Sequence, residues 1–159
     1  MQFSTWRTLK LGIHKSAIDL LDALQKDMGH RFNELETGVL NKISVAPTET
    51  EIELVNVSAI ELGFKEGGVV DDGQVRMKAN EIGLELLPAE AGPELRLQYN
   101  DQPMNEVMHI GTELVGGSYS RRRFILVNDK YDRRLNIHPA WIVEDWPTDD
   151  RWVFVRKQK

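Results

Sequence analysis

Hydrophobic positions in the first part of the chain recur every three to four residues, which predicts helices. Between Ser16 and Gly29 the apolar residues form one helical stripe: Ala17, Leu20, Leu21, Leu24 and Met28. The Ser16 hydroxyl can cap the first N–H groups, and Gly29 supplies a C-terminal stop. The same spacing predicts two shorter helices, over 33–43 and 71–83, each opened by a capping residue.

Other segments alternate between apolar and polar residues, which predicts half-buried strands. Residues 51–57 and 95–99 have this pattern, and the proline-rich stretch 88–93 between helix and strand is predicted to be a loop. Beyond Pro103 the helical period disappears. β-Branched and aromatic residues there predict extended structure over four segments: 107–110, 123–127, 135–137 and 152–155.

The two patterns together predict one α+β domain over residues 1–159, helix-rich over 1–104 and β-rich over 105–159. Two to three helices in the first half should pack on a largely antiparallel sheet. The all-β C-terminal third should complete that sheet.

Composition narrows the function classes. The chain has 159 residues, no cysteine and a net charge of −5. Without cysteine it has no disulfide framework, no thiolate metal site and no cysteine nucleophile. The four histidines are scattered, so we expect no metal and no cofactor. No stretch approaches the ~20 apolar residues of a membrane span, so we expect a cytoplasmic protein with no membrane partner.

The charge is divided unevenly along the chain. Residues 1–104 carry 10 basic and 17 acidic side chains, whereas residues 105–159 carry 10 basic and 8 acidic ones. The overall negative charge therefore does not exclude an anionic partner at the C-terminal third.

Two stretches resemble segments of a known family. Residues 83–103 (GLELLPAEAGPELRLQYNDQP) and 149–156 (DDRWVFVR) are similar to parts of a family of small, uncharacterised bacterial proteins. The helix start at Ser16 and residues 61–64 look similar too. The resemblance implies a bacterial or phage protein that is intracellular. It brings no activity, cofactor or catalytic residue with it.

The sharpest chemical feature is a basic and aromatic cluster in the C-terminal third. Its members are Arg121, Arg122, Arg123, Trp141 and Trp146. Arginine and tryptophan are the side chains that most often anchor a partner surface. This composition favours a noncatalytic binding or protein-interaction domain with a protein or small-ligand partner, using a groove or patch there. An edge strand protected by charge explains the same arginines without any function.

Two alternatives remain. His109 lies within a predicted strand and could act with a carboxylate, Glu94 or Glu106, in a small metal-independent hydrolase or transferase. Nucleic acid is a possible partner of Arg121, Arg122 and Arg123, since arginine matches phosphate oxygens. Acidic residues interleave with the basic ones, which disfavours that reading because nucleic-acid surfaces concentrate one sign of charge.

Overall fold

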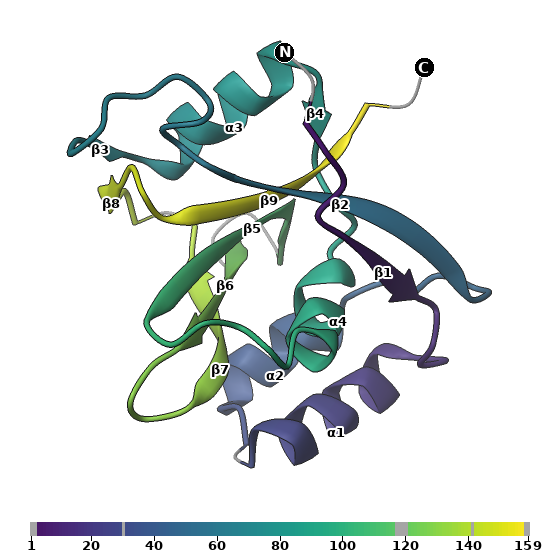
Figure 1. Ribbon diagram of the computed structural model, residues 1–159. Coiled ribbons are helices and arrows are strands. Elements are labelled where there is room, and N and C mark those ends of the chain that lie inside the picture. The colour runs from purple at the N-terminus through teal and green to yellow at the C-terminus, as the bar shows by residue number, and fades with distance from the viewer. Residues whose placement is uncertain (1–2, 30, 117–120, 141, 158–159) are drawn as a thin grey trace.

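A curled mixed sheet organises the molecule (Figure 1). The computed structural model describes residues 3–29, 31–116, 121–140 and 142–157. The main strands lie in the order β1 (Arg7–Leu11), β2 (Thr50–Ser58), β9 (Arg151–Arg156), β5 (Glu106–Val115), β6 (Arg122–Asn128) and β7 (Arg133–Pro139). All neighbours pair antiparallel except β5 and β9, which are parallel.

Two short pairings extend this frame. Strand β4 (Leu84–Glu85) pairs with β9, and strand β3 (Val69–Val70) pairs with β8 (Trp146–Pro147) in a separate two-stranded sheet. The small β3–β8 sheet ties the segment after β7 to the start of α3 (Asp72–Glu81). This connection positions the site described below.

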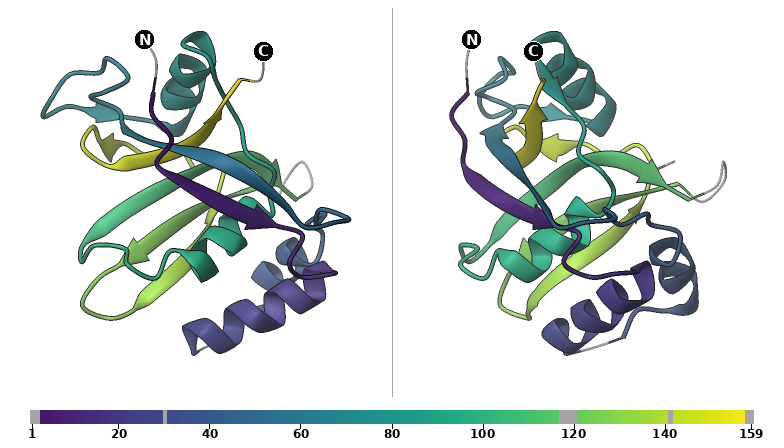
Figure 2. Two further views of the ribbon diagram at one scale, coloured as in Figure 1. Left: turned by 45° about the vertical axis from the view of Figure 1, so that its right-hand side comes forward. Right: turned by 90° about the vertical axis from the view of Figure 1, so that its right-hand side faces the viewer.

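The helices divide between the two faces of the sheet. One core joins α1 (Ala17–Met28), α2 (Glu34–Leu40) and α4 (Ala91–Gln98) to one face of the strands. A second core packs α3 against the other face through Val75, Ala79, Trp152 and Phe154. Figure 2 shows the result, with α1 and α2 at one end of the molecule and α3 at the other.

The three predicted helices are confirmed, and their caps explain where they begin. The Ser16 hydroxyl accepts a hydrogen bond of 3.1 Å from the Asp19 N–H, and Gly29 ends α1 at a φ of 74°. Asn33 and Asp71 each form a complete capping box. Because a cap uses only neighbouring residues, the sequence reveals it directly.

The segment 88–99 differs from the prediction. It holds a fourth helix, α4, so the predicted loop over 88–93 and strand over 95–99 are wrong. Pro93 lies in the first helical turn, where its missing N–H costs nothing. Leu95 and Tyr99 both reach the core, and their spacing of four residues is that of one helix face. The apolar residues at 95, 97 and 99 therefore fit a helix as well as a strand.

The fold class is confirmed as a single α+β domain whose C-terminal third contains strands only among its described elements. Strand β1 is an addition to the predicted set. Within the residues that the structure describes, no helix combines the length and apolar character needed to cross a membrane.

Candidate functional site

A hollow of about 260 Å³ lies where the start of α3 meets the segment that follows β7. It is lined by Asp71, Asp72, Gly73, Arg123, Ala140, Ile142, Val143 and Glu144. We call this the Arg123 hollow, and we call residues 142–150, which include β8, the strap. The strap carries two exposed apolar side chains at the rim, Ile142 and Val143, and Val143 is 82% exposed.

Arg123 lies buried in the lining of this hollow, with 5% of its side chain exposed. Its Nη2 group donates to the Ile142 carbonyl at 3.3 Å, and its Nη1 lies 4.0 Å from the Asp72 carboxylate. Asp72 also accepts from Arg76 Nε at 2.6 Å. The charge of Arg123 is therefore used within the protein, where it holds the strap to α3.

Trp146, within the strap, packs its ring against two histidines. The Trp146 ring meets His109 edge-on at 4.7 Å and His138 at 5.7 Å, measured between centroids. His109 in turn stacks on Trp152 at 4.1 Å. Of the two tryptophans in the predicted cluster, the structure describes Trp146, whereas Trp141 lies outside the described residues.

Two histidine–carboxylate pairs fasten the strap at its two ends. His138 Nε2 lies 3.0 Å from Glu144 Oε1, and His109 Nε2 lies 2.9 Å from Asp150 Oδ2. Because an ionised carboxylate only accepts hydrogen bonds, these contacts place a proton on each Nε2. The strap is thus held by Arg123, by two histidines and by the packing of its own Trp146 ring.

Burial governs the chemistry of His109. Desolvation lowers the pKa of its imidazole, and the hydrogen bond to Asp150 only partly opposes that shift. Its ring lies between two indoles, and only 2% of its side chain is exposed. His109 therefore lacks the access to a substrate that the hydrolase hypothesis requires of it.

The structure does not join His109 to either predicted carboxylate. Glu106 accepts from the Tyr99 hydroxyl at 2.9 Å. Glu94, with 1% of its side chain exposed, contacts His14 Nδ1 at 2.9 Å. The partner of His109 is Asp150, from the turn before β9, and this pairing depends on a contact between distant parts of the chain.

The His14–Glu94 pair is a feature that sequence reasoning missed. Gln98 donates to the second Glu94 oxygen at 3.2 Å, and Glu90 accepts from the N–H groups of Gly12 and Ala46 at 2.7 and 2.8 Å. Glu90 directly precedes α4 and Glu94 lies one turn further along, a spacing that the prediction of a loop and a strand concealed. They fix the loop that carries His14, whose side chain is 23% exposed.

The three consecutive arginines do not share one surface. Successive side chains of a strand point to opposite faces, so Arg122 and Arg123 on β6 diverge, and both are buried, whereas Arg121 is exposed. Later arginines are paired with acids: Arg133 with Asp27, and Arg134 with Asp129 and Asp132. The contacts with Asp129 and Asp132 raise the pKa of Arg134.

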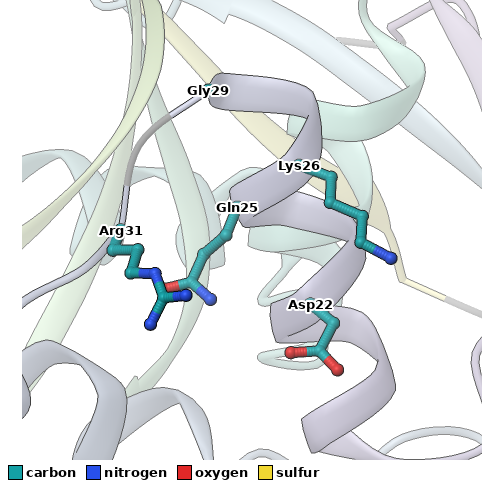
Figure 3. Close-up of a pocket in the computed structure, with 5 residues that line it drawn as sticks. All are labelled: Asp22, Gln25, Lys26, Gly29 and Arg31. Atoms are coloured by element: carbon teal, nitrogen blue, oxygen red, sulfur yellow. The ribbon is translucent and has the colours of Figure 1, made fainter.

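A second hollow, of about 380 Å³, lies at the end of α1 (Figure 3). Asp22, Gln25 and Lys26 come from the helix, and Arg31 approaches from the segment after Gly29. Opposite charges share this lining, and Gln25 is engaged by the Phe32 N–H. No group of three metal-ligating side chains occurs in the described ranges.

Comparison of the chain with protein-family models, with curated proteins and with solved structures gives no match. The resemblance of residues 83–103 and 149–156 to a bacterial family therefore stays a prediction. The case for a function depends on the geometry alone.

Proposed function

We propose that the protein is a noncatalytic binding domain whose partner docks at the Arg123 hollow and the adjoining strap. The observation that carries this proposal is Val143, an aliphatic side chain 82% exposed at the rim of a hollow. A partner that covers both an exposed aliphatic side chain and the hollow beside it removes apolar surface from water, which favours binding.

The strap is also preorganised, which favours binding. Arg123 holds its Ile142 carbonyl, and His138 and His109 hold its Glu144 and Asp150 side chains. A surface fixed before binding loses little conformational entropy when a partner docks. Binding at the strap needs no movement of these anchors.

Nucleic acid is the less favoured partner. Arg133, Arg134 and Arg151 all form ion pairs with acids, and Arg123 is turned inward. Nucleic-acid binding depends on basic groups that can release counterions from phosphates. Arginines neutralised within the protein supply little of that driving force.

The test compares two exposed aliphatic positions. Val143→Asn replaces the aliphatic group at the rim with an uncharged polar one, whereas Ile18→Asn makes the same kind of change at a residue of α1 that is 61% exposed. Tagged wild-type protein and both variants are recovered from the source cells, and bound proteins are identified by mass spectrometry. We expect a partner that Ile18→Asn retains and Val143→Asn loses. A partner set that both variants retain contradicts the proposal.

A second candidate function, a metal-independent hydrolase, is favoured by the His14–Glu94 pair. Because the Glu94 carboxylate accepts from Nδ1–H, the Nε2 atom of His14 keeps a lone pair that can take a proton. A water molecule activated in this way would attack the carbonyl carbon of a small ester. The alcohol would leave and receive the proton from His14, so the products are an acid and an alcohol.

This candidate has a matched control in the same molecule. His138 is 22% exposed and also meets a carboxylate, but it does so through Nε2. Hydrolysis of p-nitrophenyl acetate should slow by at least about 100-fold in His14→Gln, the low side of general-base effects. It should stay unchanged in His138→Gln. Equal rates for His14→Gln and wild type would remove the hydrolase from consideration.

A further inference from the structure

We infer that the partner presents a lysine or arginine side chain next to an apolar one. The inference rests on the proposed function, because it names the chemistry of the group that the Arg123 hollow and the strap receive. Some charged side chains around the hollow are paired within the protein and others are exposed to solvent, and the exposed ones determine which partner fits.

All charged side chains of the strap are acidic. Residues 142–150 contain four carboxylates and no basic side chain: Glu144, Asp145, Asp149 and Asp150. The facing start of α3 adds Asp71 and Asp72 at the lining of the hollow. A partner surface that approaches these elements meets a predominantly negative field.

Two of the nearby cations, Arg76 and Arg123, are directed into the protein, whereas Arg121 and Lys65, whose backbone carbonyls accept from Ala140 and Thr148, are exposed. Arg76 donates to Asp72 and to the Thr112 carbonyl, both at 2.6 Å. Arg123 is buried and faces Asp72 and the Ile142 carbonyl. Both guanidinium groups are therefore directed to one inner carboxylate, Asp72, and to backbone oxygens.

The outer carboxylates remain exposed. Asp145 and Asp149 are solvent-exposed, and Glu144 is half-buried beside His138. Val143 and Ile142 stand directly before them in the chain, also exposed. Apolar and acidic groups thus alternate over a short length, and the complementary surface has an apolar group flanked by cations.

An anionic partner fits less well. It would have to approach Glu144 and Asp145 to reach Arg123, whose guanidinium is already engaged with the protein. Like charges brought together at an interface cost free energy, which selects against such partners. The same argument sets nucleic acid aside at this surface.

The test uses three synthetic peptides of one length, in which leucine alternates with lysine, with serine or with glutamate. Titration calorimetry at low salt measures each Kd on the full chain. We expect the lysine peptide to bind most tightly and its affinity to fall as salt is added, since screening weakens exposed ion pairs. Tighter binding of the glutamate peptide, or binding of none of the three, overturns the inference.

Charge-neutral variants locate the contact. Glu144→Gln combined with Asp145→Asn should weaken the lysine peptide by about threefold to tenfold, the effect of one or two exposed ion pairs. Asp22→Asn combined with Glu34→Gln changes the net charge equally on α1 and α2, and should leave the Kd unchanged. Equal weakening by both double variants means only general attraction, which also overturns the inference.

The two proposals can fail separately. If Val143→Asn loses the cellular partner but the lysine peptide does not bind at the strap, the docking surface stands and the basic character of the partner is refuted. If Val143→Asn retains every partner, the docking surface itself is refuted, whatever the peptides show.

Discussion

His109 lies between the indole rings of Trp146 and Trp152, and its Nε2 contacts the Asp150 carboxylate. Burial disfavours the charged imidazolium, so the pKa in the folded protein lies below the ordinary value of 6.5. In the unfolded chain the same group binds a proton as the pH falls through 6.5. The unfolded state therefore binds more protons than the folded state in this range.

We predict that the free energy of unfolding decreases as the pH is lowered below 6.5, in part because of His109. Urea unfolding of wild type and His109→Phe at about pH 8 and about pH 5 measures this contribution. The wild-type protein should lose more stability on acidification than the phenylalanine variant.

If His109→Phe and wild type lose equal stability on acidification, burial of a neutral His109 is not the cause.

At the level of elements, α4 depends on close packing rather than on its own sequence pattern. A Cβ atom at Gly92 would lie 2.4 Å from the Phe124 ring of β6, so only glycine permits this approach. Gly38 of α2, by contrast, has open space around it. These two helical glycines therefore have opposite roles.

We predict that Gly92→Ala destabilises the protein by about 1–3 kcal/mol, the usual cost of overpacking. Gly38→Ala should stabilise it by about 0.4–1 kcal/mol, because alanine restricts the unfolded chain and favours helix. Chemical denaturation of both variants gives the two values. A stabilising Gly92→Ala would mean that α4 does not pack against Phe124 as described.

The same elements show what could be predicted from the sequence. Helices α1, α2 and α3 begin at caps formed by residues three apart, so local sequence is enough to find them. Helix α4 has no side-chain cap, carries prolines before and within it, and contains an apolar alternation typical of strands. Its contacts with the sheet decide its conformation, and a single sequence does not reveal them.

The candidate site depended even more on distant contacts. Arg123 and Trp146 were identified from residue type, but the hollow between α3 and the strap joins residues some seventy positions apart. His109–Asp150 and His14–Glu94 likewise span 41 and 80 positions. The residue types indicated the candidate residues, but the topology of the chain determines which side chains contact one another.

For the molecule as a whole, the last strand lies in the centre of the sheet. Strand β9 pairs with β2 on one side and β5 on the other, and its Trp152, Val153 and Phe154 are fully buried. The sheet is therefore continuous only when strands from both the first and the last parts of the chain are present. The helix-rich part of the chain cannot close its sheet without the C-terminal strand.

We predict that deletion of residues 151–159 abolishes cooperative unfolding, because it removes the central strand and opens both cores. Circular dichroism during thermal unfolding of the shortened chain tests this. A sharp transition like that of the full chain would contradict the described order of strands.

The proposed binding surface is the Arg123 hollow together with the strap. The most direct measurement follows the backbone amide NMR signals of the full chain as the leucine–lysine peptide is added. We predict that the largest changes fall on residues 71–73 and 142–146, and that they disappear in Val143→Asn. Changes concentrated on α1 and α2, or identical in that variant, would contradict it.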